Sequence, residues 1–301
     1  MDLCEGRVAV VTGAARGLGR AHALALAAEG AAVVVNDFGV SLDGTDAQAG
    51  PAQQVVDEIV GAGGRAVANT DDVADWAGAK RLVDTAIEEF GRLDVLVNNA
   101  GFLRDRMLAN LDEEHWDAVI RVHLKGHFAP LRHAAAYWRA EAKAGRQPDA
   151  RVINTSSGAG LLGSIGQGNY SAAKAGIAGL TIVAAAEMGR YGITVNAIAP
   201  AARTRMTEAT FAETMAAPDD DSFDAMAPEN VSPLVVWLGS SESAHVTGRV
   251  FEVEAGKITV AEGWRRGPTV DKGARWEPVE LGSVVDDLLA QATPPEPVYG
   301  A

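Results

Sequence analysis

Short apolar runs alternate with longer stretches of helical periodicity along most of this chain. The apolar runs predict buried strands at Arg7–Thr12, Ala32–Asn36, Arg65–Asn69, Leu93–Asn98, Ala150–Thr155, Ile193–Ile198 and Arg249–Glu254. Between them, apolar residues recur at helix spacing in Leu18–Glu29, Ala47–Val60, Ala74–Phe90, Glu113–Ala144, Asn169–Arg190 and Ser232–Gly239. Continuous apolar strands that alternate with helices are typical of a sheet covered on both faces. The pattern therefore predicts an α/β fold with a doubly wound parallel sheet, whose cleft lies at the carboxyl ends of the strands.

The regular pattern continues without a linker to about residue 255. We therefore expect one domain over residues 1–301, with the α/β core in 1–255 and a C-terminal extension in 256–301. The extension is richer in Trp, Gly and Pro and carries one weak helical pattern at Pro278–Gln291.

Three places depart from this regularity. Pro130 lies inside the long helical stretch and predicts a kink there, because proline lacks the N–H that a helix interior needs. The connections Phe38–Ala47 and Ala202–Pro228 are longer than a strand–helix link requires. Long loops in compact domains often have a functional role.

Composition and charge narrow the class of protein. The chain is 48% hydrophobic and 22% charged, which is ordinary for a globular protein. It has 26 Lys and Arg against 40 Asp and Glu, a net charge of −14, whereas nucleic acids and anionic membranes bind clustered cations. No apolar run reaches the roughly 18 residues of a membrane span, and the start lacks a secretory signal pattern. Cys4 is the only cysteine, which excludes an intrachain disulfide and a metal cluster built from cysteines. Together, these features lead us to expect a cytoplasmic protein with no metal site, no nucleic-acid partner and no membrane partner.

A glycine-rich loop follows the first predicted strand and opens the first predicted helix. It reads Thr12-Gly13-Ala14-Ala15-Arg16-Gly17-Leu18-Gly19. Glycine lets the backbone turn sharply and approach a ligand closely, and the helix N-terminus attracts a pyrophosphate. The alternative is a plain strand–helix turn, but a position between strand and helix in a βαβ unit favours dinucleotide binding.

Acidic and small residues end the next three strands. Asp37 ends the second strand, where a carboxylate accepts hydrogen bonds from ribose hydroxyls and repels a 2′-phosphate. The sequence therefore predicts NAD rather than NADP as the cofactor. The alternative is that Asp37 caps a helix or is an ordinary loop residue. Asp72 is a candidate for the adenine edge, and Asn98-Asn99-Ala100-Gly101 for the path of the cofactor; both also suit turns.

A tyrosine and a lysine lie four residues apart on one helix face. The unperturbed pKa of a tyrosine is near 10, and a nearby ammonium lowers it, so Tyr170 and Lys174 suit acid/base chemistry. Alone, such a pair is common on protein surfaces. Ser157, at the end of the fifth strand, belongs to the same cleft, where its hydroxyl can bind a substrate oxygen. Ser156 is the neighbouring alternative, but side chains alternate along a strand and only one of the two points into the cleft.

Taken together, the glycine loop, Asn98–Gly101, Ser157 and the Tyr170–Lys174 pair resemble the short-chain dehydrogenase/reductase family, over about residues 1–255. The resemblance implies a Rossmann fold. It implies that Tyr170 is the acid/base, that Lys174 lowers its pKa and binds the nicotinamide ribose, and that Ser157 orients the substrate oxygen. Hydride would pass between nicotinamide C4 and the carbinol carbon. The implied cofactor contacts are Gly13, Arg16, Gly17, Leu18, Gly19, Asp37, Asp72, Val73, Asn99, Ala100, Gly101, Tyr170, Lys174 and Pro200.

Two positions depart from the pattern of that family. The family usually carries an Asn within Val-Asn-x-x-Gly in the long helix, where this chain has His123 between Val122 and Leu124. That Asn helps to hold a water in the proton relay, so His123 is a candidate to serve the relay through a ring nitrogen, or else a core histidine. Pro200-Ala201-Ala202 also stands where the family usually has Pro-Gly.

Seven further segments, which include the His123 substitution, point to one subgroup. They are Val35–Gly39, Gly64–Asn69, Leu103–Arg106, Arg121–Leu124, Ser164–Ser171, Arg205–Thr207 and Val250–Val253. These segments resemble the (3R)-hydroxyacyl-CoA dehydrogenase unit of peroxisomal multifunctional enzyme type 2, also called 17β-hydroxysteroid dehydrogenase type 4. Without hydratase or sterol-carrier regions and without a peroxisomal address, the chain is expected to be a free-standing bacterial counterpart.

The resemblance implies NAD-linked oxidation of a 3-hydroxyacyl-CoA, with a steroid alcohol such as a 17β-hydroxyl as the alternative. A non-catalytic dinucleotide-binding scaffold is the reading from another class. Cations that would bind the CoA phosphates are Arg203, Arg205, Arg265 and Arg266. Apolar residues that would line a steroid slot are Phe211, Met215, Met226 and Trp264. Relatives form dimers or tetramers through the long and catalytic helices, and the small and apolar residues of Ala172–Ala186 fit a homodimer or homotetramer.

Overall fold

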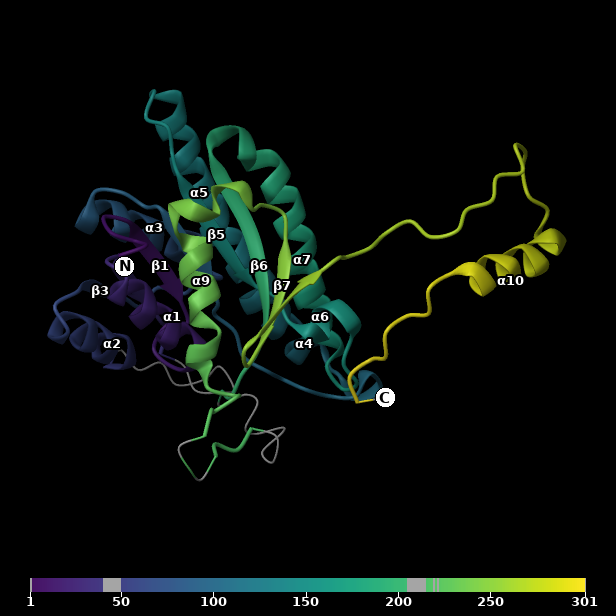
Figure 1. The fold of residues 1–301 in the computed structure, drawn as a ribbon, viewed down its shortest axis with the longest axis horizontal. Helices are drawn as coiled ribbons and strands as arrows, with labels where there is room; N and C mark the ends of the chain where they lie inside the picture. Colours follow the sequence, from purple (N-terminus) through teal and green to yellow (C-terminus); the bar gives the residue numbers. More distant parts are fainter. Residues whose placement is uncertain (1, 40–49, 205–214, 219, 221, 301) are drawn as a thin grey trace.

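The computed structural model describes residues 2–39, 50–204, 215–218, 220 and 222–300, and within them eight strands form a single sheet (Figure 1). The strands are β1 (Val8–Thr12), β2 (Ala32–Asn36), β3 (Arg65–Asn69), β4 (Val95–Asn98), β5 (Ala150–Thr155), β6 (Ile193–Ala201), β7 (Val250–Glu254) and β8 (Lys257–Ala261). Their order is β3-β2-β1-β4-β5-β6-β7-β8. All pairs from β3 to β7 are parallel, and β8 is antiparallel to β7. The predicted doubly wound parallel sheet is confirmed.

Helices link the strands and cover both faces of the sheet. They are α1 (Gly17–Ala28), α2 (Gly50–Gly61), α3 (Trp76–Phe90), α4 (Glu113–Ile120), α5 (Gly126–Lys143), α6 (Gly158–Leu162), α7 (Gly168–Met188), α9 (Ser232–Gly239) and α10 (Leu281–Gln291). Short 3-10 turns lie at Leu108–Asn110, Gly189–Tyr191, Pro228–Asn230, Ser241–His245 and Pro278–Glu280.

Alternate residues of each strand feed two separate cores. Val10 of β1 lies beside Val34 of β2 and Leu96 of β4, and these three side chains pack against the layer of α3, α5 and α7. Ala9 and Val11 point the opposite way, into the layer of α1, α2 and α9. Because each face is covered by helices, both faces of a strand must be apolar, which explains the continuous apolar runs in the sequence.

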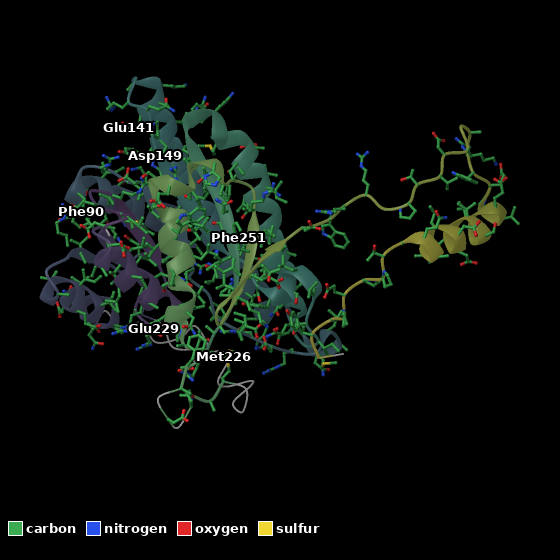
Figure 2. All side chains as sticks on the ribbon, in the orientation of Figure 1. Phe90, Glu141, Asp149, Met226, Glu229 and Phe251 are labelled. Atoms are coloured by element: carbon green, nitrogen blue, oxygen red, sulfur yellow. The ribbon has the colours of Figure 1, made fainter. Side chains whose placement is uncertain are left out.

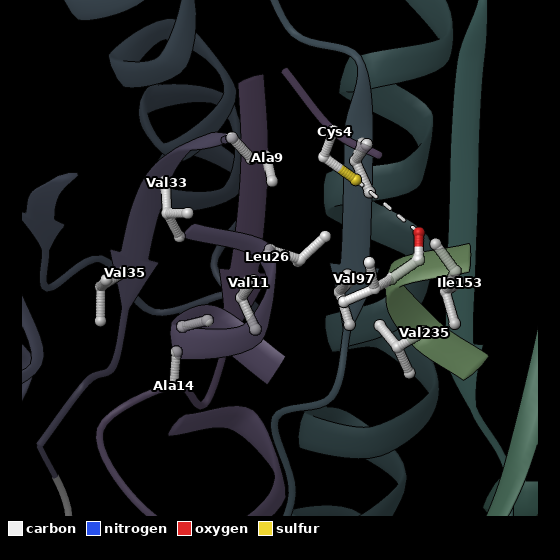
Figure 3. Close-up of a cluster of buried hydrophobic side chains, with 14 of the residues drawn as sticks. Cys4, Ala9, Val11, Ala14, Leu26, Val33, Val35, Val97, Ile153 and Val235 are labelled. Carbon is white, nitrogen blue, oxygen red and sulfur yellow. Dashed lines mark hydrogen bonds between the residues drawn. The ribbon is translucent and has the colours of Figure 1, made fainter. Parts of the chain in front are cut away.

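Figure 3 shows the core between the sheet and the layer that contains α1 and α9. Cys4 is fully buried there and its thiol donates to a backbone carbonyl of α9, with an S···O distance of 3.7 Å. Burial raises the pKa of this thiol to about 11, so it stays protonated and serves as a packing group.

The long helix is interrupted at Arg121–Lys125 and not at Pro130, so the predicted position of the kink is wrong. A π-turn at Arg121–Lys125 separates α4 from α5, while Pro130 lies inside α5. A proline ring crowds the carbonyl four residues earlier, here that of Gly126, and the wider turn directly before that point relieves the crowding. π-Turns are frequent at functional sites, and this one carries His123.

The extension contributes more structure than the sequence indicated. Lys257–Ala261 forms β8 at the edge of the sheet, whereas the sequence placed the last strand at Arg249–Glu254. From residue 262 the chain forms an arm that stands away from the body, carries α10 and returns beside α6 (Figure 1). The predicted helix at Pro278–Gln291 is confirmed as a 3-10 turn that leads into α10.

One helix in the described part of the chain, Gly168–Tyr191, is long and apolar enough to cross a membrane, with a mean hydropathy of 1.2. Core helices of folded domains pass the same test. Here the helix packs against the sheet and buries Ala173, Ile177 and Ala185.

Candidate active site

The order of the strands reverses between β1 and β4, and in open α/β sheets this switch point is where ligands bind. The glycine loop lies there. Gly13 and Gly17 have φ values of +63° and +52°, in the left-handed region. A Cβ on Gly13 would lie 2.8 Å from the Cα of Ala100, and one on Gly19 would lie 2.1 Å from the carbonyl oxygen of Gly13. Only glycine fits these positions, and the tight loop presents the N-terminus of α1 to the crevice.

Thr12 and Asn99 hold the glycine loop against the end of β4. The Thr12 hydroxyl accepts from the backbone N–H groups of Asn99 (2.9 Å) and Ala100 (3.1 Å). The Asn99 amide donates to the carbonyls of Thr12 (3.0 Å) and Gly13 (3.2 Å). These bonds give Asn99 and Ala100 a definite task in shaping the loop from behind.

Asp37 lies beside the glycine loop, directly after β2. Its carboxylate accepts from the backbone N–H groups of Ala15 (3.0 Å) and Gly39 (2.8 Å). Because a carboxylate has about four acceptor positions, Asp37 can still bind hydroxyl groups of a ribose. The geometry therefore suits the role predicted from the sequence.

Asp72 is committed to its own turn. One carboxylate oxygen accepts from the N–H of Ala74 (2.8 Å) and the other pairs with Arg121. Val73 is buried, and a Cβ on Gly126 would lie 2.9 Å from its Cγ2. These bonds explain Asp72 as a turn residue that ties β3 to the π-turn, and Val73 as a packing residue beside α5.

The remaining predicted cofactor contacts lie at the same edge of the sheet. Arg16 is exposed at the N-cap of α1, and Leu18 is in its first turn. Pro200 is near the end of β6. Thr204, just beyond β6, would lie 3.6 Å from a Cβ on Gly17, so the segment after β6 reaches the glycine loop.

Three predicted catalytic side chains converge from β5, α6 and α7. Ser157 caps α6, with its hydroxyl accepting from the N–H of Ala159 (3.2 Å), and its side chain acts on the phenol of Tyr170, whose pKa it lowers. Lys174 lies one turn along α7 and is 2% exposed. Its Nζ donates to the carbonyl of Thr155 (2.6 Å) and lies 5.4 Å from the centroid of the Tyr170 ring.

Ser156, the alternative to Ser157, is committed elsewhere. It is buried, and its hydroxyl donates to the carbonyl of Lys174 at 2.8 Å. This bond ties the end of β5 to α7 and leaves Ser157 as the serine that reaches the phenol.

Burial shifts the pKa values of Tyr170 and Lys174 in opposite directions. Loss of solvation raises the pKa of Tyr170 to about 12, although the hydrogen bond from Ser157 opposes this shift. The same effect lowers the pKa of Lys174 to about 7. The sequence predicted a lowered pKa for Tyr170, and this direction is wrong for the chain by itself. Desolvation is the largest contribution, and the lysine ammonium is directed at the Thr155 carbonyl.

His123 packs directly on Tyr170. The two rings meet edge to face, with centroids 5.2 Å apart and an interplanar angle of 89°. The ring also lies on Gly101, where a Cβ would come within 2.1 Å of the His123 Cε1. The glycine of the Asn-Asn-Ala-Gly segment is therefore required by the histidine.

One ring nitrogen of His123 has a partner and the other does not. Nε2 lies 2.7 Å from the carbonyl oxygen of Phe102 and 3.1 Å from its nitrogen. Nδ1 is buried and has no hydrogen-bond partner among the described residues, whichever tautomer is assigned. Burial and, to a smaller extent, the charge of Lys174 lower the pKa of His123 to about 3, so the ring is neutral. The sequence left open a relay or a core role, and the geometry combines a packed ring with a buried, unpartnered nitrogen.

Asn169, which the sequence analysis did not single out, aligns the start of α7. Its amide nitrogen donates to the carbonyls of Arg104 (3.0 Å) and His115 (3.3 Å). Its oxygen accepts from the N–H of Tyr170 (2.8 Å). An amide directly before the tyrosine, at a helix start, was the only signal available.

Among the described residues, the predicted substrate-binding arginines do not gather at this site. Arg203 forms an ion pair with Asp224. Arg265, paired with Glu262, and Arg266 are exposed on the arm.

Among the described apolar candidates, Met215 and Met226 lie together beside Arg203, which donates to the carbonyls of both, whereas Trp264 lies apart from them on the arm. Met215 is buried, Met226 is partly buried and Trp264 is fully exposed on the arm. Arg205 and Phe211 lie outside the described residues. So do residues 40–49, which belong to the first long connection and to the start of the helix predicted from Ala47, and residues 205–214 of the second long connection.

Comparison with known proteins agrees with this architecture. The sequence profile of the short chain dehydrogenase family matches residues 7–214. The chain is 48% identical over 300 residues to hydroxyacyl-CoA dehydrogenase ChsB1 of Mycobacterium tuberculosis, which covers 96% of this chain and 90% of that protein. It is 47% identical over 254 residues to peroxisomal multifunctional enzyme type 2 of Mus musculus. That alignment covers 84% of this chain but only 32% of the mouse protein. The crystal structure of a short chain dehydrogenase from Mycobacterium avium is 67% identical, with a TM-score of 0.90, covering 99% of this chain and 100% of that one.

Proposed function

Because this chain belongs to the short-chain dehydrogenase family, we propose that it oxidises the hydroxyl of a 3-hydroxyacyl-CoA to a ketone with NAD. Membership makes it an oxidoreductase that uses a nicotinamide dinucleotide. The observation that carries the chemistry is the convergence of Ser157, Tyr170 and Lys174 at the carboxyl edge of the sheet. The similarity to ChsB1, a hydroxyacyl-CoA dehydrogenase by name, supports the choice of substrate.

In this proposal Tyr170 takes the proton of the substrate hydroxyl. Ser157, whose side chain acts on the phenol, binds the substrate oxygen and so holds it within reach of Tyr170. An oxidised nicotinamide, when bound, would supply the acceptor for the hydride of the carbinol carbon and, until that transfer, a positive charge that favours the phenolate. Lys174 supplies a second positive charge in its protonated form, which is about half populated near its pKa of about 7, and its Nζ is fixed by the Thr155 carbonyl. The neutral ring of His123 covers the far side of Tyr170 and excludes water.

The residues present fit a dinucleotide. Glycines at 13 and 19 let the loop fold tightly against Ala100 and the Gly13 carbonyl, so that the N-terminus of α1 faces the crevice and would bind the pyrophosphate. The carboxylate of Asp37 would bind the adenosine ribose. Its negative charge supports NAD over NADP, because a 2′-phosphate would be repelled.

A steroid alcohol is the second candidate substrate. It is favoured by one observation: among the described residues, the arginines predicted for CoA phosphates are either paired with acids or exposed on the arm. A steroid needs no such cations.

Paired kinetics test the proposal. We expect kcat/KM with NAD to be at least tenfold higher for a 3-hydroxyacyl-CoA than for a 17β-hydroxysteroid; the reverse ranking would favour the second candidate. Tyr170→Phe should lower kcat by about 10²-fold or more while leaving the dissociation constant of NAD within about threefold. Turnover close to wild type in this variant would remove Tyr170 from the mechanism.

We also propose that the chain assembles as a homodimer or homotetramer. Ile182 and Val183 of α7 are 56% and 55% exposed although they lie on the predicted catalytic helix. On the arm, Leu281, Val285 and Leu289 recur at helix spacing and are exposed as well. Apolar surface of this kind is typical of subunit contacts.

A further inference from the structure

The C-terminal end of the arm returns to a defined place. After α10 the chain runs back to the loop that joins α6 to α7, where Tyr299 bridges to Ser164. The Tyr299 carbonyl accepts from the N–H of Ile165 (3.0 Å), and its own N–H donates to the carbonyl of Gly163 (3.2 Å). Figure 2 shows that the side chains of the arm between β8 and this point of return stand apart from the body. The end of the arm is therefore held by strand-like bonds of the backbone.

These bonds bring the Tyr299 side chain next to the predicted catalytic serine. Gly158 directly follows Ser157, and the three atoms nearest to a Cβ on Gly158 all belong to Tyr299: its Oη at 2.7 Å, Cε2 at 3.0 Å and Cζ at 3.1 Å. Val298 lies against Gly163 in the same way, 3.4 Å from a Cβ there. The glycines of α6 and of the following loop thus make room for this tail.

The exposed part of the Tyr299 ring is not needed to hold the tail in place. The backbone bonds already fix the tail, and the side chain is 48% exposed. Partial burial and the carboxylates of Glu252, Glu254 and Glu296 raise the pKa of the phenol, so it remains neutral. The ring offers an apolar face and a neutral hydroxyl at the carboxyl edge of β5 and β7.

We propose that Tyr299 is a wall of the substrate pocket beside Ser157 and selects substrates by the group attached to the reacting carbon. The inference rests on the proposed function, since it places the substrate at Ser157 and Tyr170. A flat ring in contact with Gly158 packs against the acyl chain, or the corresponding part of another alcohol. Tyr299 is thus a specificity residue supplied by the far end of the chain.

Kinetics across a homologous series test this role. The panel consists of 3-hydroxyacyl-CoA substrates of increasing chain length, measured with wild type, Tyr299→Ala, Tyr299→Phe and Val279→Ala. Val279, 91% exposed on the same arm, is the matched control. Tyr299→Ala should raise KM at least fivefold for the best substrate and change the ratio of kcat/KM between long and short chains at least fivefold. Tyr299→Phe and Val279→Ala should keep the wild-type ratio, and all variants should keep the wild-type Tm within about 2 °C.

A double-mutant cycle tests the contact itself. Gly158→Ala should reproduce the altered ratio in the wild-type background, because the added methyl group displaces Tyr299. In the Tyr299→Ala background it should change the ratio less than twofold. An unchanged ratio in Tyr299→Ala, or an equal effect of Gly158→Ala in both backgrounds, would overturn the inference while leaving the proposed function in place. Absence of any turnover by wild type would overturn the proposed function, and this inference with it.

Discussion

Tyr170 and Lys174 illustrate how one environment acts on two protonation equilibria. Burial favours the neutral form of each group, so it raises the pKa of the phenol to about 12 and lowers that of the ammonium to about 7. Near neutral pH the phenol keeps its proton and the lysine is poised close to its own midpoint. Any further positive charge in the crevice therefore acts on the phenol in a poorly solvated site, where charge interactions are strong.

His123 is the residue at which packing and proton transfer can be separated. His123→Phe fills the space of the ring but removes the unpartnered Nδ1, whereas His123→Asn keeps a polar group and leaves a cavity. If Nδ1 takes part in proton transfer, His123→Phe should lower kcat at least tenfold, and His123→Asn should retain a larger fraction of the wild-type kcat. Asn should nevertheless be less stable by about 1–3 kcal/mol.

The measurements for His123 are kcat, KM and the free energy of unfolding of both variants. Full kcat in the Phe variant, together with a loss in the Asn variant that follows stability, would identify His123 as a packing residue only.

Asp37 determines the cofactor in the proposed function. Asp37→Asn retains an acceptor for the N–H of Ala15 but removes the negative charge that opposes a 2′-phosphate. We expect the ratio of kcat/KM for NADP to that for NAD to rise at least tenfold in this variant and in Asp37→Ala. Asp57→Asn, on the exposed face of α2, is the charge-matched control and should leave the ratio unchanged. A wild type that already prefers NADP would contradict the assignment.

At the scale of elements, Asn169 couples the start of α7 to the segment around Arg104. Asn169→Ala would leave two carbonyls and the N–H of Tyr170 without their partner. We expect a loss of about 1–3 kcal/mol in the free energy of unfolding and a lower kcat, since the phenol would no longer be held in place. Ser171→Ala is the control: it is two positions along the same helix, its hydroxyl has no hydrogen-bond partner in the described part of the chain, and the change should cost less than about 0.5 kcal/mol. Equal losses in the two variants would show that Asn169 does not position α7.

The elements that the sequence predicted are those whose signals are local. Buried strands such as Ala32–Asn36 are apolar on both faces, and the glycine loop and the Tyr170–Lys174 spacing lie within a few residues. β8 was missed because its residues are largely exposed and its strand conformation depends on pairing with β7. The contact of Tyr299 with Gly158 depends on the return of the arm, and no periodicity records such a contact.

The direction of the pKa shift at Tyr170 was missed for a related reason. The spacing of a lysine reveals its proximity, whereas desolvation depends on everything that packs around the phenol. The position of the π-turn was missed for the same reason. Pro130 predicted a distortion of the long helix, but the turn in which the distortion occurs depends on the packing around the helix.

For the whole molecule, the exposed apolar residues of α7 predict self-association. We expect wild type to sediment as a dimer or tetramer and Ile182→Asp to shift the distribution to lower mass. Val60→Asp on α2, where the side chain is 53% exposed, is the matched control and should sediment like wild type. A monomeric wild type at micromolar concentration would contradict the proposed assembly.

Buried histidines make the stability of the whole fold depend on pH. Burial lowers the pKa of His22 and His123 from 6.5 to about 3, and that of His127 well below 6.5. His22 joins α1 to α9 through a 2.9 Å contact between its Nδ1 and the Ser232 hydroxyl, so its neutral form is part of the folded structure. Below pH 6.5 the unfolded chain binds protons that the native protein does not, and stability therefore falls as the pH falls.

We expect the free energy of unfolding, from urea titrations, to drop by about 2 kcal/mol between pH 6.5 and 5.5 through His22 and His123 together. His127 and His133, whose pKa values are lowered as well, act in the same direction. This window lies below the folded pKa of Lys174, about 7, and above the ordinary values of Asp and Glu, 3.8 and 4.5, so groups other than the histidines contribute little. His22→Asn should reduce the drop by about 1 kcal/mol whatever its effect on stability at pH 6.5. A flat profile in wild type, or an undiminished drop in His22→Asn, would show that the native protein accommodates these protons and that the histidines are not held neutral by the fold.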